Sequence, residues 1–377
     1  MSAQQERQQR ITVLQTDPTT TTTLESLLGA TSILIFVGSW LSSLVSPLIL
    51  SLALIYGHRI IAAFVVCVAV IAYLPWEHGI ISKGYQNFLN RYHPLYYDGG
   101  VSMIYEGGVE NINAATGTKR QTLYAVHPHG AFCIGWSFLY HNRRMIAERV
   151  RFCFAPLLYA SPIFRLFSRM ANRPGSASKS AMDCYLREGD DVALPPGGFE
   201  EATLTHTSTD RVYVKRRYGF VKLCLKHGVS IRPVYAFGEG RLYSNIQGMW
   251  SVRLAMNGYN IPAIFPWGLW FFPLLPKKDV GLFIVVGRPL ILPKLANPTQ
   301  VEVAMWHDNY VRELKRIYEE YKEEAYGSER GKISKLEGCR LSPRRTNGAR
   351  NAADGFSTTH YDTGREIKET PPPTIGG

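Results

Sequence analysis

Two histidines in the segment His127-Pro128-His129-Gly130 are the strongest candidates for chemistry in this sequence. They follow a short apolar run that predicts a β-strand, so they stand where that strand ends. An imidazole has an unperturbed pKa of about 6.5, which suits it to take a proton from a substrate near neutral pH. Gly130 leaves room for a ligand or another chain segment to approach the backbone. A pair of hydrogen-bonded histidines that brace a turn is the structural alternative.

A second candidate segment, residues 194–201, reads Leu-Pro-Pro-Gly-Gly-Phe-Glu-Glu and also follows a predicted strand. The carboxyl ends of parallel strands meet at one edge of a sheet, so we expect the two segments to lie together. Gly197 and Gly198 would expose backbone N–H groups to a developing oxyanion, and Glu201 would orient a histidine. A tight turn is the simpler interpretation of the two glycines.

The third segment, residues 215–222, reads Lys-Arg-Arg-Tyr-Gly-Phe-Val-Lys and places four cations at the start of a predicted helix. Cations and the free N–H groups of a helix start suit a phosphate group. Contact with an anionic bilayer is the main alternative. Nucleic acid is disfavoured, because the net charge of +12 is modest and no nucleic-acid motif is present.

Two further patterns carry less weight. Ser176-Ala177-Ser178-Lys179 matches the Ser-x-x-Lys signature of some serine acylases, but its companion motifs are missing. The sequence has no His-Glu-x-x-His motif and no Cys-x-x-Cys pair among its six cysteines. We therefore expect no metal site and reduced thiols in a protein that faces the cytosol.

The elements that must position these segments alternate between strand and helix. Strands are predicted at residues 123–126, 191–194, 231–237 and 282–286, and helices at residues 163–170, 181–187 and 220–227. A long helix begins with a capping box of Thr299 and Glu302 and ends at Gly327. Apolar side chains at steps of three and four give this helix one buried face, made of Val303, Trp306, Tyr310, Leu314, Ile317 and Tyr321. Such alternation predicts an α/β fold with a mixed, largely parallel sheet covered by helices.

A long apolar block, residues 26–76, precedes this region and carries Arg59 as its only full charge. About 20 apolar residues cross a bilayer, so the block is long enough for a hairpin of two membrane helices. We predict one pass near residues 28–45 and a second that ends near Trp76. The turn falls at Pro47 or at Gly57-His58-Arg59. A cleaved signal peptide is disfavoured because 25 mostly polar residues precede a block that is too long for one.

Four parts follow from this division: a polar N-terminal segment (1–25), a transmembrane hairpin (26–76), a catalytic domain (77–327) and a disordered tail (328–377). The catalytic part holds 30 basic and 21 acidic side chains, so it carries most of the positive charge. Basic residues just beyond the hairpin favour the cytosol for this part. A second group of aromatic residues within it suits a surface where lipids enter, namely Trp267, Trp270, Phe271 and Phe272.

In their order along the chain, the three candidate segments resemble the type-2 diacylglycerol acyltransferase family, which includes monoacylglycerol and wax-alcohol acyltransferases. Further matching stretches are Pro233-Val234-Tyr235-Ala236-Phe237-Gly238-Glu239, Gly287-Arg288-Pro289, residues 293–299 and His307-Asp308-Asn309-Tyr310. The resemblance spans about residues 75–327. It departs from the family at His93, Lys179, Pro195-Pro196 and Tyr218, which concerns the choice of acceptor rather than the class of reaction.

The resemblance implies a glycerolipid acyltransferase-like fold and acyl-CoA-dependent esterification of a neutral lipid alcohol, most of all diacylglycerol. It also implies the endoplasmic reticulum membrane and lipid droplets as locations, and no cofactor, since acyl-CoA is a substrate. Membrane lipids are further partners, and a homo-oligomer is left open. We favour His129 as the general base, paired with Glu201, over His127. The substrate-binding residues are then Pro128, Gly130, Lys179, Gly197, Gly198, Arg217, Gly219, Phe220 and Lys222.

Three alternatives remain at this point. A monoacylglycerol or wax-alcohol acyltransferase differs only in its acceptor. A membrane serine lipase or thioesterase would use Ser176 or Ser178 with Lys179 and would form a covalent acyl-serine. A lipid-binding scaffold without catalysis would not need either histidine.

Overall fold

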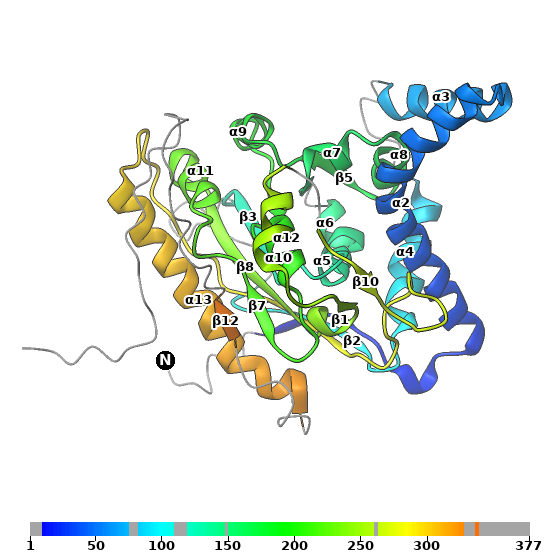
Figure 1. Ribbon diagram of the computed structural model, residues 1–377. Helices are drawn as coiled ribbons and strands as arrows, with labels where there is room; N and C mark the ends of the chain where they lie inside the picture. The colour runs from blue at the N-terminus through cyan, green and yellow to red at the C-terminus, as the bar shows by residue number, and fades with distance from the viewer. Residues whose placement is uncertain are drawn as a thin grey trace, which may run out of the picture. The chain divides into compact units, whose positions relative to one another are not determined.

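The computed structural model describes residues 10–74, 82–108, 119–147, 150–259, 263–327 and 336–338. An eight-stranded sheet with the order β1-β2-β11-β8-β3-β6-β4-β5 forms its centre (Figure 1). Within it, β1 pairs antiparallel with β2 and β11 antiparallel with β8, while the other neighbours are parallel. Its strands are β1 (Ile11–Gln15), β2 (Val101–Tyr105), β3 (Thr122–His127), β4 (Arg151–Phe154), β5 (Arg173–Ser176), β6 (Val192–Leu194), β8 (Ser230–Phe237) and β11 (Leu282–Val286). The prediction of a mixed, largely parallel α/β fold is confirmed.

Helices cover both faces of this sheet. They are α2 (Thr23–Ile55), α3 (Arg59–Tyr73), α4 (Lys83–Tyr92), α5 (Ile134–His141), α6 (Arg143–Ala147), α7 (Pro156–Tyr159), α8 (Pro162–Ala171), α9 (Lys179–Arg187), α10 (Gly198–Leu204), α11 (Gly219–His227), α12 (Trp250–Asn257) and α13 (Gln300–Tyr326). Short 3-10 helices are η1 (Pro18–Thr20), η2 (His93–Tyr96) and η3 (Glu239–Arg241). Two small sheets pair β9 (Ser244–Asn245) with β10 (Pro266–Trp267) and β7 (Asp210–Val212) with β12 (Leu336–Gly338).

The central strands are buried on both faces because their side chains alternate. In β3, Tyr124 and Val126 join a core cluster with α2, α4 and α5, whereas Leu123 and Ala125 join a second cluster with α9, α11 and α13. The predicted strands and helices of the catalytic part are confirmed to within about two residues. Thr299 and Glu302 form the expected capping box of α13, and its apolar face packs on the second cluster.

The apolar N-terminal block is one long helix and one short one. Helix α2 continues through Pro47 to Ile55, and the chain turns at residues 56–58 into α3. With 15 residues, α3 is shorter than the roughly 20 that cross a bilayer. Within the described residues, one helical stretch, Thr23–Ser43, is long and apolar enough to span a membrane. The structure therefore does not confirm the expected hairpin of two spans. Trp76 lies outside the described residues.

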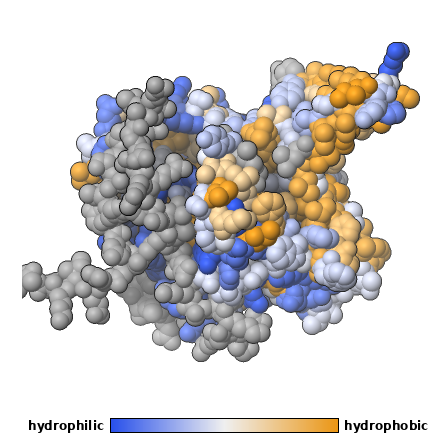
Figure 2. Space-filling model, in the orientation of Figure 1, coloured by the Kyte–Doolittle hydropathy of each residue, from blue (hydrophilic) through white to orange (hydrophobic). Residues whose placement is uncertain are grey.

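Residues from the predicted N-terminal segment and from the apolar block take part in the main sheet and its core. β1 forms an edge of the main sheet, so residues 11–15 are not a separate polar segment. On α2, Ile33, Phe36 and Val37 are buried in the first core cluster. The distal half of α2 and α3 keep apolar side chains exposed, and Figure 2 shows this hydrophobic surface. Within the expected tail, the structure describes β12 as a strand paired with β7.

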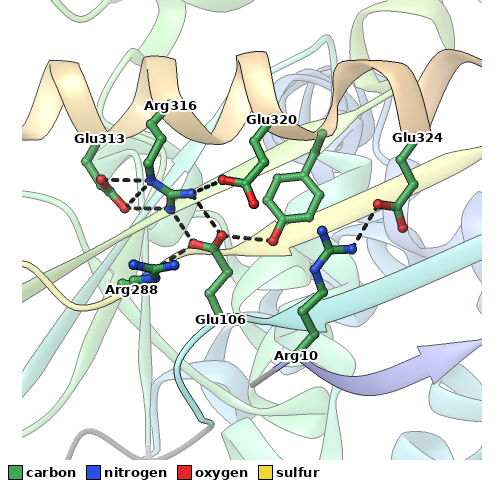
Figure 3. A network of polar contacts seen from close by, with 8 residues as sticks. Arg10, Glu106, Arg288, Glu313, Arg316, Glu320 and Glu324 are labelled. Carbon is green, nitrogen blue, oxygen red and sulfur yellow. Dashed lines mark hydrogen bonds and ion pairs between the residues drawn. The ribbon is translucent and has the colours of Figure 1, made fainter. Parts of the chain in front are cut away.

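A network of charged side chains connects Arg10, next to β1, and Glu106, next to β2, to α13 (Figure 3). Glu106, which is 4% exposed, accepts hydrogen bonds from the Arg316 guanidinium at 2.5 and 3.0 Å and from the Tyr321 hydroxyl at 2.8 Å. Arg10, next to β1, pairs with Glu324 at 2.9 Å and stacks over the Tyr321 ring. Polar contacts thus join α13 both to the residue before β1 and to the end of β2, where Glu106 is the buried acceptor.

Replacing Glu106 by Gln keeps the shape of this side chain but removes its charge. We expect the free energy of unfolding to fall by about 2 kcal/mol, because hydrogen bonds to charged groups contribute about 1.5–3 kcal/mol each and Arg316 keeps Glu313 and Glu320 as partners. Chemical denaturation of the purified protein in detergent measures this loss. The control Glu319→Gln removes an exposed pair with Lys322 and should cost less than about 0.5 kcal/mol. Equal losses for both variants would contradict the role given to Glu106.

Candidate active site

The two predicted segments meet because the strands that carry them are neighbours. β3 ends at His127 and β6 ends at Leu194, and the two strands pair in parallel, so both chains leave the sheet at the same edge. After β6 the chain turns into α10, whose first turn carries Glu201. Glu201 lies in contact with the histidine segment, as the sequence predicts.

The Glu201 carboxylate holds three groups at once. The Nδ1 of His127 donates to it, 3.0 Å from each carboxylate oxygen. The backbone N–H of His129 donates at 2.6 Å and that of Tyr213 at 2.8 Å. Glu201 therefore pairs with the ring of His127 and with the backbone of His129. The expected pairing with the ring of His129 is not the one that the structure has.

The two histidines point to opposite faces of the sheet. His127 continues the alternation of β3 onto the face of α13, where its ring lies 6.2 Å from that of Tyr310. The chain turns at Pro128, and the His129 ring comes to the other face, 6.5 Å from the ring of Trp40 on α2. The turn between them is the physical reason why two residues so close in sequence have different partners.

His129 lines a narrow cavity of about 30 Å³ between α2, α5, β4 and α10. The other walls are mostly apolar or aromatic, with Trp40, Trp136, Phe154, Leu158 and Phe199 among them. His127 is fully buried, does not line this cavity, and has an Nε2 with no hydrogen-bond partner among the described residues. Of the two rings, His129 is the one that a molecule in the cavity would meet.

Hydrogen bonds determine which nitrogen of each ring carries a proton. The Nδ1 of His129 donates to the carbonyl of Gly130 at 2.9 Å, which leaves its Nε2 with the lone pair of a base. Burial lowers the pKa of His129, and the Gly130 carbonyl and the Glu201 charge oppose part of this shift. Burial alone would raise the pKa of Glu201, but His127 and the N–H of Tyr213 hold it below its usual value. A neutral imidazole thus stands beside an ionised carboxylate.

Glu239 is a second buried acid that the sequence reasoning did not select. It follows β8, the other neighbour of β3, and its carboxylate accepts from the backbone N–H groups of Ile134 at 3.1 Å and Gly135 at 2.5 Å. Burial raises its pKa to about 8, although these N–H groups oppose the shift. A Cβ at Gly130 would lie 1.9 Å from a Glu239 oxygen, so the carboxylate occupies the space that this glycine leaves. The feature of the sequence that could have identified Glu239 is its position directly after the strand β8.

The two glycines of the second segment have roles in the packing of this site. The N–H of Gly198 donates to the carbonyl of Pro195 at 3.2 Å, which closes a turn. A Cβ at Gly197 would lie 1.9 Å from Glu201, so only glycine leaves room for the carboxylate. Arg217 donates to the carbonyl of Gly197 and forms an ion pair with Glu200. The basic stretch and the glycine segment are therefore in direct contact.

The remaining predicted residues are spread over both faces of the sheet. Phe220 packs against Tyr310 in the core and does not line the cavity of His129. Gly219 begins α11, and Lys222 is exposed on that helix. Pro128 is buried in the histidine turn.

The Ser-x-x-Lys pattern of residues 176–179 is explained by its position at the start of α9. Ser178 caps α9 by accepting the N–H of Ala181, and the hydroxyl of Ser176 accepts the N–H of Ser178. Lys179 is exposed at the start of the same helix. The residues therefore form a helix start.

A neutral base on an apolar cavity, with a buried histidine–carboxylate pair behind it, defines a site suited to proton transfer on an apolar substrate. The family model of diacylglycerol acyltransferase matches residues 110–333, and this chain belongs to that family. It is 31% identical to mouse (Mus musculus) 2-acylglycerol O-acyltransferase 1 over 226 residues, 53% of this chain and 65% of that protein. It is 28% identical to diacylglycerol O-acyltransferase 2 of Dictyostelium discoideum over 239 residues, 59% of this chain and 72% of that protein. The match to the mouse relative thus spans slightly less than two thirds of its length.

Replacing Gly197 by Ala tests the packing of Glu201. The new methyl group displaces the carboxylate from His127, and we expect a loss of about 1–3 kcal/mol in the free energy of unfolding, as for other overpacked sites. Thermal unfolding in detergent measures it. Gly84→Ala is the matched control, because a Cβ there meets nothing within 4 Å. A Gly197→Ala variant as stable as this control would show that Glu201 is not held as described.

Proposed function

We propose that this protein is an acyl-CoA-dependent O-acyltransferase that esterifies diacylglycerol to triacylglycerol. Membership of the family supports the reaction class, and relatives named for both diacylglycerol and 2-acylglycerol support a neutral acylglycerol as acceptor. The observation that carries the proposal is the position of His129, a neutral imidazole on an apolar cavity. An acceptor that carries phosphate is disfavoured, because the ionised carboxylate of Glu201 lies directly behind His129.

The proposed reaction needs no covalent enzyme intermediate. The Nε2 of His129 takes the proton of the acceptor hydroxyl as its oxygen attacks the carbonyl carbon of the thioester. The tetrahedral intermediate then collapses, the carbon–sulfur bond breaks, and the imidazolium returns the proton to the sulfur of coenzyme A. Glu201 supports this step, because its carboxylate holds the His129 backbone and its charge favours the imidazolium. His127 in turn holds the Glu201 carboxylate through its Nδ1.

The oxyanion of that intermediate needs hydrogen-bond donors in the cavity. Gly198 is not free to donate, since its N–H closes a turn. The indole Nε1 atoms of Trp40 and Trp136 are buried and have no partner in the part of the chain that the structure describes. Both indoles line the cavity of His129. A buried N–H without a partner costs free energy in the empty site, and this cost is recovered where negative charge develops. We assign the two indoles to the oxyanion.

We further propose that the enzyme works at the endoplasmic reticulum membrane and at lipid droplets, with its catalytic domain in the cytosol. The anchor consists of α2 and the short α3, whose apolar side chains are exposed. Trp270 and Phe271 are 91% and 73% exposed, which suits insertion into a bilayer. Exposed cations of the basic stretch, Arg216 and Lys222, remain candidates for the phosphates of coenzyme A.

The direct test supplies labelled acyl-CoA to membranes that contain the protein, with diacylglycerol, monoacylglycerol, fatty alcohol or sterol as acceptor. We expect triacylglycerol as the main product and, for His129→Ala, a rate at least about 100-fold lower, the usual cost of losing a general base. His206→Ala is the control, because this ring bonds to Ser208 outside the cavity. A His129→Ala rate above about a tenth of the wild-type value would exclude His129 as the base. Transfer to fatty alcohol or monoacylglycerol alone would reassign the acceptor.

Trp136→Phe tests the indole donors, because it removes an N–H and keeps an aromatic ring. We expect kcat to fall about 100-fold, as for other oxyanion donors, with little change in KM. The control Trp250→Phe changes an indole that stacks with Arg211 and Arg253 elsewhere. Unchanged kcat in Trp136→Phe would remove this indole from the mechanism.

A further inference from the structure

A second cavity, of about 380 Å³, lies at the far end of α5 from His129. α5 begins at Ile134, next to Cys133 in the wall of the first cavity, and ends at His141 in the wall of the second. The other walls come from β1, the end of α4, η2 and the start of α6. Its volume lies within the range of about 300–1,000 Å³ that is usual for ligand pockets. The cavity is thus separate from the proposed active site.

One buried polar atom in this wall lacks a partner. His141 is 5% exposed, and its Nδ1 makes no hydrogen bond to any residue within the described ranges. The neighbouring His93 is fully buried but satisfied, since its two ring nitrogens bond to the hydroxyls of Ser32 and Ser137 at 3.1 and 3.0 Å. A buried polar atom without a partner costs free energy, so a ligand that bonds to the His141 ring would offset a real loss.

The charge of the wall favours an anion. Arg143 and Arg144 follow α5 directly and both line the cavity, while no Asp or Glu is among its described lining residues. Arg143 is exposed, donates to Asn87, and keeps further N–H groups on its guanidinium. Guanidinium groups bind carboxylate and phosphate through two parallel hydrogen bonds. Burial keeps the pKa of His141 well below its ordinary value, so the positive charge comes from the arginines.

Part of the wall is apolar, although Asn90 and Asn142 also line it. Val13 and Leu14 from β1, Leu89 from α4 and Phe138 from α5 line the cavity together with the polar groups. A purely polar anion would leave these side chains without contact, whereas a hydrocarbon chain would cover them. The wall therefore fits a molecule with one anionic end and one apolar chain.

We propose that this cavity binds the anionic head of a single-chain lipid, with a carboxylate or phosphate against Arg143, Arg144 and His141 and the start of the chain against the apolar side chains. This site does not depend on the proposed function, because it shares no residue with the cavity of His129. A fatty acid and a lysophospholipid both have an anionic head on one apolar chain, so the experiment distinguishes them by competition.

The test uses the full-length protein in nanodiscs of neutral phosphatidylcholine and a photoreactive diazirine fatty acid, with labelled peptides mapped by mass spectrometry. We expect label on η2 and on the segment from α5 to α6. The double variant Arg143→Gln and Arg144→Gln should reduce this label at least about tenfold, whereas Arg187→Gln, an exposed arginine paired with Asp183, should not. A diazirine fatty alcohol of equal length should label the segment at least about tenfold less than the acid.

Two further variants separate binding from folding. His141→Phe removes the unpartnered nitrogen and keeps the ring, so the protein should stay folded while the label falls. Val13→Trp fills the apolar wall and should have the same effect, with unchanged thermal unfolding as the check on folding. Competition by unlabelled oleate assigns the site to a carboxylate, and competition by lysophosphatidate alone assigns it to a phosphate. Equal labelling by acid and alcohol, full label in the double arginine variant, or complete competition by millimolar inorganic phosphate would overturn the proposal.

Discussion

The buried carboxylate of Glu201 is the contact on which the arrangement of the site depends. It is nearly inaccessible to solvent, yet it stays ionised because His127 and two backbone N–H groups donate to it. These donors come from the end of β3, from the turn after it and from the segment that follows β7. One carboxylate thus joins three chain segments that are up to 86 residues apart in sequence, between His127 and Tyr213. A buried charge without such partners would be too costly to keep.

The membrane-directed helix and the catalytic site are parts of one structure. The N-terminal half of α2 buries Phe36 and Val37 in the core and brings Trp40 against His129. Its distal half, together with α3, keeps apolar side chains at the surface. The same helix therefore contributes to the wall of the cavity and carries the surface suited to lipid. Under the proposed function, this places His129 close to the surface from which a lipid acceptor would enter.

Three of the buried polar atoms without a partner among the described residues belong to side chains that line a cavity: the Nε1 atoms of Trp40 and Trp136 and the Nδ1 of His141. They line two separate cavities at the two ends of α5. By contrast, Glu239 is buried but satisfied by the first N–H groups of that helix, and it holds the helix start in place.

Local patterns in the sequence determined the strands, the capped helix α13 and the meeting of the two candidate segments. Alternation, capping residues and the common edge of parallel strands depend on few neighbours along the chain. The tertiary structure decided which histidine Glu201 contacts, because the turn at Pro128 sends the rings of His127 and His129 to opposite faces of the sheet. It also decided that α2 belongs to the core and that Phe220 packs away from the cavity. These outcomes depend on the rotation of helices and the direction of side chains across long separations, and no local pattern encodes them.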